Sequence, residues 1–452
     1  MAAPAPTVGK FVTGSTLGHV ITMTVTGSIG LVAVFFVDAL NLFYISLLGQ
    51  QELAAAVGYA GTLLFFNTSI AIGLSIAATA LTSRALGRGR RDEARQLAGA
   101  SLVLMGGIMT SLAILQFPLL STLLHWLGAR GRTAELALGF MRIVLPSLPL
   151  LGLGMCLSGL LRAVGDARRA MFVTLGAAAA VAVLDPLLIF GFKLGIDGAA
   201  LATVLSRLTM AGIGWHGLMR VHGLIARPRA AVFRRELQPF MLIGLPAVLT
   251  QVATPVGNAF VTASIADFGD DAVAGWAVIS RLIPVAFGVI FALSGAVGPI
   301  LGQNFGAQRH DRLRSTIRDS FGVTLVYVLA VWALLALLSG TIAGLFGATG
   351  LARELIVFFC LFVAGSFVFN GALFVANAAF NNLGFALYST ALNWSRATLG
   401  VIPFVWYGAK AHGALGVLAG YGLGVVVFGI VGTLLCFRVL ARLQRGAARP
   451  TH

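Results

Sequence analysis

The chain has 452 residues, of which 58% are hydrophobic and only 10% are charged, and its mean hydropathy is +0.94. So much apolar sequence excludes a soluble globular protein and indicates an integral membrane protein. The formal charge of +16 does not indicate nucleic-acid binding, because the positive residues are spread over short connections between apolar runs and no soluble domain gathers them.

Apolar runs long enough to cross a membrane as helices recur along the whole chain. About 20 residues are needed to cross a hydrocarbon core of roughly 30 Å. About twelve such runs are present, near residues 20–48, 54–82, 96–119, 136–161, 169–192, 198–219, 240–266, 273–301, 319–345, 354–380, 387–409 and 414–438. We therefore expect an all-α integral membrane fold of twelve transmembrane helices.

The basic residues alternate between the two sides of these predicted helices. Most of the 31 Lys and Arg residues lie in every second connection, for example in residues 84–95 and 309–318. By the positive-inside rule this pattern predicts that both termini are cytoplasmic, which requires an even number of spans. We expect a multi-pass protein of the bacterial cytoplasmic (inner) membrane.

The second half of the chain repeats the first. The connections SRALGRGRRDEAR and GQNFGAQRHDRLR match at one constant offset, which pairs Gly87 with Gly306 and Asp92 with Asp311. This offset moves the register by six spans, so matching helices share one orientation, as in transporters with a parallel repeat. We expect two pseudo-symmetric six-helix lobes, residues 1–225 and 226–452.

Only two of the fifteen acidic residues, Asp38 and Asp185, lie inside long apolar runs. A carboxylate there costs at least about 2.5 kcal/mol on the insertion scale, which favours a functional role. The repeat aligns Asp38 with Asn258 and Asp185 with Ile402, so ion chemistry is predicted in the first lobe alone. Structural capping, or pairing with an arginine, is the alternative.

Each acid has a neighbour that suits ion binding. Asn41 follows Asp38 by three residues and therefore lies on the same helical face. Pro186 follows Asp185 and removes a backbone donor, which frees a carbonyl one turn earlier. Pro246 is the second expected helix kink. H⁺ and Na⁺ are both compatible with these residues.

Several motifs resemble the multidrug and toxic compound extrusion (MATE) family across essentially the whole chain. They are VD at 37–38, LGxxELAAxxG at 48–58, LGxGxxxxAR at 86–95, LDPLLIFGF at 184–192 followed by GAALAT, and GLPAVLTQ at 244–251. The resemblance implies a two-lobed MATE/MOP-type fold. It also implies export of organic cations or other amphipathic compounds in exchange for H⁺ or Na⁺, by rocking of the lobes around a cavity.

The family's cation site implies specific residues in this chain. Two aspartates, an Asn one turn before the second and a Thr on the sixth helix would correspond to Asp38, Asp185, Val181 and Thr203. Val181 departs from the pattern, and a valine offers no oxygen to Na⁺, so H⁺ is the expected coupling ion. Gln251 stands where some members have a glutamate, which argues against a second Na⁺ site.

Other polar residues in the spans have two interpretations each. Gln251, Asn258 and Asn377 could line a substrate cavity in the second lobe, or could make interhelical hydrogen bonds. Arg207, Arg281 and Arg396 could neutralise an acid, or could lie at misplaced boundaries. All six residues fall within predicted spans.

The remaining function classes are less well supported. A flippase for a lipid-linked or other amphipathic metabolite is the alternative, but one that handles pyrophosphate needs several cations in one cavity. No nucleophile, base or metal motif indicates an enzyme, and Cys156, Cys360 and Cys436 lie in predicted spans. We expect no cofactor, no metal site and no nucleic-acid partner. The expected partners are membrane lipid and small-molecule substrates, and the chain is expected to be a monomer.

Overall fold

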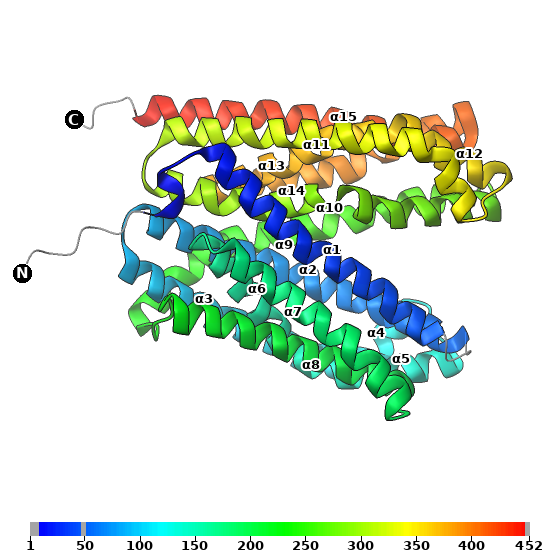
Figure 1. Cartoon of the computed structure of the whole chain (residues 1–452), viewed down its shortest axis with the longest axis horizontal. Helices are drawn as coiled ribbons and strands as arrows, with labels where there is room; N and C mark the ends of the chain where they lie inside the picture. Colours follow the sequence, from blue (N-terminus) through cyan, green and yellow to red (C-terminus); the bar gives the residue numbers. More distant parts are fainter. Residues whose placement is uncertain (1–8, 47–50, 448–452) are drawn as a thin grey trace, which may run out of the picture. The chain divides into compact units, whose positions relative to one another are not determined.

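The computed structural model describes residues 9–46 and 51–447, apart from a few side chains that include that of Asp38. The described part contains helices and no strand (Figure 1). The α-helices are α1 (Thr16–Ser46), α2 (Gln51–Gly87), α3 (Arg91–Gln116), α4 (Leu120–Trp126), α5 (Gly131–Val144), α6 (Leu148–Ala163), α7 (Ala167–Pro186), α8 (Gly195–Trp215), α9 (Ala230–Ala266), α10 (Asp270–Gly306), α11 (His310–Leu345), α12 (Gly350–Phe358), α13 (Phe367–Leu383), α14 (Ala386–Ser395) and α15 (Ile402–Ala447).

Eleven stretches of the described chain are long and apolar enough to cross a membrane. The last of them, Ala386–Arg445, has 60 residues, and a straight helix of that length would measure about 90 Å. Its backbone leaves the helical region at His412 and Gly413, where the φ angles are −140° and 60°. The break divides this stretch into two segments that can each cross a membrane. The expected all-helical fold with twelve spans is therefore confirmed.

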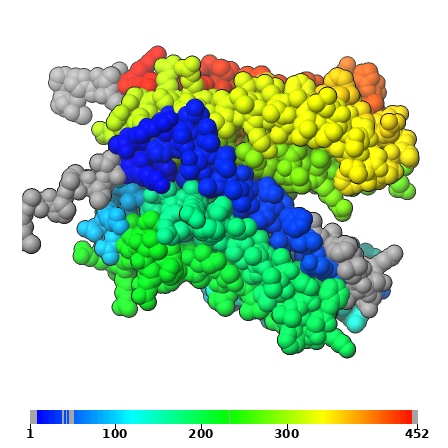
Figure 2. Space-filling model, in the orientation of Figure 1, coloured from blue at the N-terminus to red at the C-terminus, as the bar shows by residue number. Residues whose placement is uncertain are grey.

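The outer faces of the helices carry large apolar side chains. On α11, Val326 and Leu337 are exposed over 70% and 82% of their surface. Figure 2 shows this helix in yellow on the face drawn there. A soluble protein rarely exposes such a continuous apolar surface, whereas a helix that faces lipid acyl chains does.

The described chain forms two compact units. The first comprises Met1–Lys10 and Ile29–Val248, and the second comprises Phe11–Ser28 and Leu249–His452. This division differs from a boundary at residue 225 in two places. The start of α9 belongs to the first unit because Gly73 on α2 lies so close to Val248 that an added Cβ would come within 2.6 Å of its Cα.

The other difference concerns the segment before α1. Phe11 is buried in the second unit, where its backbone N–H donates to Gln303 Oε1 at 2.8 Å and its carbonyl accepts from Arg312 at 2.9 Å. These bonds fasten the segment to α10 and α11, although it precedes the first span in the sequence.

Corresponding helices have corresponding partners in the two units. In the first unit α6 packs against α2, α3 and α8, and in the second α13 packs against α10, α11 and α15. Figure 1 shows α11 and α15 side by side.

Left-handed backbone positions also repeat along the chain. Gly128 and Gly347 both have positive φ, as do Gly165 and Gly384, and each pair keeps the constant offset of the sequence repeat. Gly89 is matched in the same way by Gln308. Positive φ strains a residue with a side chain, so these positions mark tight connections that both halves have kept.

Candidate functional site

Asp185 is fully buried near the end of α7 in the first unit, with 0% of its surface exposed. Its Oδ2 accepts a hydrogen bond of 2.6 Å from Asn41 Nδ2 on α1. Its Oδ1 has no hydrogen-bond partner among the described residues. A buried carboxylate with one neutral donor has no positive partner to offset the cost of burying its charge. Binding a proton or a cation would remove that cost.

Asp38 lies on α1 three residues before Asn41, which places the two positions on one face of the helix. Its side chain is outside the part that the structure describes. The structure therefore joins the two predicted helices through Asn41 and Asp185.

The chain around Asp185 leaves α-helical geometry immediately after the acid. α7 ends at Pro186, and residues Leu187–Gly191 form a π-helical turn. Proline removes the backbone donor that would continue the α-helix, and π turns often occur at functional positions. Gly198 on α8 supports the turn, because an added Cβ would lie only 2.7 Å from the carbonyl carbon of Leu188.

Val181 precedes Asp185 in the sequence and Thr203 follows it, and the family resemblance places both at the cation site. The hydroxyl of Thr203 donates to the carbonyl of Ala199 on its own helix at 3.0 Å. This bond uses the hydroxyl hydrogen within α8 and leaves the lone pairs of Oγ1 unused by it. The grouping of Thr203 with Asp185 stays a prediction. Val181 lies one helical turn before Asp185 on α7, where its apolar side chain cannot coordinate an ion.

The three arginines in the predicted spans have different surroundings. Arg207 is 7% exposed and donates to the Val144 carbonyl at 3.2 Å and to Ser147 Oγ at 2.8 Å. Arg281 is exposed on α10. Arg396 is 4% exposed and donates to Thr254 Oγ1 at 3.0 Å. None of the three forms a salt bridge in the described part of the chain.

The second half of α9 carries a polar stripe in the second unit. Gln251, Thr254 and Asn258 follow one another at spacings of three and four residues, which puts them on one helical face. Gln251 and Thr254 are half-buried and Asn258 is exposed. Pro246 precedes the stripe within α9, two residues before the first unit ends at Val248.

Asn377 makes its hydrogen bonds with α14 and not with this stripe. It is buried on α13, where its Oδ1 accepts from Asn393 Nδ2 at 3.0 Å and its carbonyl accepts from Ser389 Oγ at 3.3 Å. These bonds connect α13 with α14. Of the two interpretations of Asn377, these bonds correspond to interhelical hydrogen bonding.

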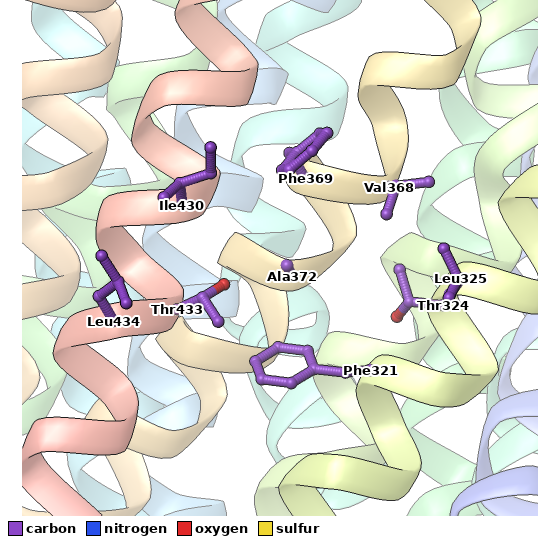
Figure 3. A pocket seen from close by; sticks show the side chains of 9 residues that line it. All are labelled: Phe321, Thr324, Leu325, Val368, Phe369, Ala372, Ile430, Thr433 and Leu434. Carbon is purple, nitrogen blue, oxygen red and sulfur yellow. The ribbon is translucent and has the colours of Figure 1, made fainter.

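A groove of about 300 Å³ lies among α11, α13 and α15 in the second unit (Figure 3). Phe321, Leu325 and Leu434 contribute apolar walls, and Thr324 and Thr433 contribute the two hydroxyls that Figure 3 labels. Both hydroxyls donate to carbonyls of their own helices. The groove therefore suits an acyl chain better than a polar substrate.

Comparisons with known proteins agree with this architecture. A sequence profile described as MatE matches residues 27–187 and 246–407. A protein named FAD transporter from Shewanella oneidensis is 28% identical over 424 residues, which cover 92% of this chain and 93% of that protein. The multidrug export protein MepA of Staphylococcus aureus is 25% identical over 84% of both chains.

Among solved structures, a mutant of the Vibrio cholerae MATE transporter VcmN is similar in fold. Its TM-score is 0.90 at 24% sequence identity, and the match covers 94% of this chain and 97% of that one. The likeness extends over both halves, so it concerns the whole fold.

Proposed function

Because the chain belongs to the MatE family, we propose that it is a secondary active antiporter that exports organic cations or other amphipathic compounds. The observation that carries this proposal is the buried, singly hydrogen-bonded Asp185 beside Asn41. With Asp38 on the same face as Asn41, these residues form the proposed ion-coupling site, and Thr203 completes the set that the family resemblance implies.

The proposed coupling ion is H⁺. A proton needs one carboxylate, whereas Na⁺ needs a shell of several oxygens. Val181, one turn before Asp185, supplies none because its side chain has no oxygen. Asn41 donates its amide hydrogen to Asp185, and this contact requires no metal.

Ion exchange and cargo release follow from the charge of the two acids. Charged Asp38 and Asp185 attract a lipophilic cation, and their protonation removes that attraction. Entry of protons from outside would then release the cargo. Alternating access of the two lobes, as the family resemblance implies, would make the exchange vectorial.

The setting proposed for this transport is the bacterial cytoplasmic membrane, with both termini in the cytoplasm and the chain acting as a monomer. The lipid-linked flippase is less well supported, since Arg207 and Arg396, the two buried arginines of the predicted spans, lie in different spans, 198–219 and 387–409. A pyrophosphate headgroup requires cations that act together.

Transport in proteoliposomes tests the proposal. An imposed pH gradient is expected to drive accumulation of ethidium, and an imposed Na⁺ gradient alone is not. Asp38→Asn and Asp185→Asn are each expected to reduce uptake to that of protein-free vesicles, because neither variant can exchange a proton at that position.

The matched control is Asp197→Asn, which removes an exposed acid from the first turn of α8. This variant should transport as the unmodified protein does. Uptake driven by Na⁺ and not by the pH gradient would contradict proton coupling, and full transport by Asp185→Asn would contradict the assigned site.

A further inference from the structure

Arg396 is a buried cation in the second unit whose charge is not neutralised by any described acid. One guanidinium nitrogen donates to Thr254 Oγ1 at 3.0 Å, while Nε has no hydrogen-bond partner among the described residues. A guanidinium has five donors and remains charged. One hydroxyl acceptor therefore leaves most of its hydrogen-bonding capacity unused.

Arg207 shows what a structural arginine looks like in the same protein. It is similarly buried, but it donates to a backbone carbonyl and to Ser147, which connect α8 with the end of α5 and the turn after it. The acceptor of Arg396 is a side-chain hydroxyl instead of a backbone carbonyl. Helix packing alone therefore does not explain the presence of this charge.

The backbone holds Arg396 in an unusual position. Residues Arg396–Gly400 form a π-helical turn between α14 and α15. Gly257 on α9 lies beside Ala397, and an added Cβ there would be in ordinary contact with the Ala397 Cα at 3.4 Å. Gly424 on α15 lies against the other end, where an added Cβ would overlap the carbonyl oxygen of Gly400. The end of the turn at Gly400 is therefore held close to α15, and π turns are frequent at functional sites.

The surroundings of Arg396 are polar and aromatic. Thr254 belongs to the α9 stripe with Gln251 and the exposed Asn258, so the acceptor of Arg396 lies on the polar face of α9. Tyr421 lies near the guanidinium, and it packs edge to face with Trp276 in the buried apolar core of the unit, with ring centroids 6.1 Å apart. An anionic group here would find a charge partner in the guanidinium and a hydroxyl in Thr254.

We propose that Arg396, with Thr254, binds the anionic group of an amphipathic substrate, either a carboxylate or a phosphate. This deepens the proposed export function and rests on it, because it adds an anion-binding group for the zwitterionic or anionic members of the amphipathic cargo. A buried arginine without a counter-ion destabilises the fold, and an anionic ligand supplies the missing charge. The proposed anion site lies within the second unit alone.

Fluorescence anisotropy of ligands with purified protein in detergent tests this proposal. Riboflavin and riboflavin 5′-phosphate differ by a phosphate, and rhodamine 123 and rhodamine 110 differ by a methyl ester in place of a carboxylate. In at least one pair the anionic member is expected to bind roughly tenfold more tightly, as expected for a charge-assisted hydrogen bond. The pair that shows the preference identifies the anionic group as phosphate or carboxylate.

Three variants assign the preference to Arg396. Arg396→Gln should abolish it while the neutral or esterified member binds as before, which also shows that the variant is folded. Arg396→Lys should retain part of it, and Arg353→Gln, which changes an exposed arginine of α12, should retain all of it.

Equal binding within both ligand pairs, or a preference that survives Arg396→Gln, would overturn the proposal. The measurement needs no ion gradient. A failure of proton-driven ethidium transport is therefore distinguishable from a failure of anion binding.

Discussion

Asp166 shows how one side chain can organise a connection between two spans. It caps the N-terminus of α7, where its Oδ1 accepts from the Arg169 N–H at 3.0 Å and its Oδ2 accepts from the Arg169 guanidinium at 2.6 Å. The His222 ring lies 2.7 Å from the same Oδ2. Burial alone raises the pKa of Asp166, but these hydrogen bonds outweigh it and hold the pKa below its ordinary value of 3.8.

A carboxylate with a lowered pKa stabilises the folded state only while it is ionised. Its contribution is complete above pH 3.8 and is lost as the pH falls through the lower folded value. Asp166→Ala is expected to destabilise the protein at neutral pH by about 1 kcal/mol, the usual effect of losing an N-cap. Thermal unfolding measured at pH 7 and near pH 3 should show the difference shrinking in acid. An equal difference at both pH values would contradict this assignment.

At the scale of helices, glycine contacts determine where chain breaks can be accommodated. Gly198 lies against the backbone of Leu188 in the first unit, and Gly416 lies against that of Gly408 in the second. The two glycines are related by the same offset that relates Gly195 to Gly413 in the sequence repeat. In both halves, therefore, a glycine allows a helix to approach the backbone near the end of the preceding span.

Gly198→Ala is expected to destabilise the first unit by about 1–3 kcal/mol, because the new methyl group would meet backbone atoms that cannot rotate away. Gly212→Ala is the matched control on the same helix, since an added Cβ there has no atom within 4 Å. The control should be neutral or slightly stabilising. Thermal unfolding of both purified variants measures the effect, and equal unfolding temperatures would contradict the packing argument.

For the whole molecule, the alternating basic connections predict the membrane orientation. Asp92 lies in a predicted cytoplasmic connection, and Thr349 lies in a predicted external one. Both are exposed, whereas the native Cys156, Cys360 and Cys436 are buried and unpaired. Introduced cysteines can therefore be labelled over a low background.

A membrane-impermeant maleimide is expected to label Thr349→Cys in intact cells, and to label Asp92→Cys only after permeabilisation. This order follows from cytoplasmic retention of Arg-rich connections. The reverse order would place both termini outside, and labelling of both positions in intact cells would contradict the alternation of spans between them.

The sequence alone was sufficient to predict the number and type of the elements and their repeat. Apolar length requires helices in a membrane because every backbone polar group must be satisfied within its own segment. The constant spacing of paired glycines predicted two similar halves, and the positive φ angles at Gly165 and Gly384 show that similarity in the backbone. The sequence also singled out Asp185 and Asn41, because a polar residue within a long apolar run is conspicuous.

Only the tertiary structure decided which polar residues contact one another. The bond from Asn41 to Asp185 joins residues 144 positions apart, and no local pattern encodes such a pairing. The difference between Arg207 and Arg396 is not encoded locally either. Arg207 donates to a backbone carbonyl, whereas Arg396 donates to Thr254 and its Nε has no hydrogen-bond partner among the described residues. Burial and hydrogen-bond partners depend on how distant helices pack, whereas helix length and spacing depend on neighbouring residues in the chain.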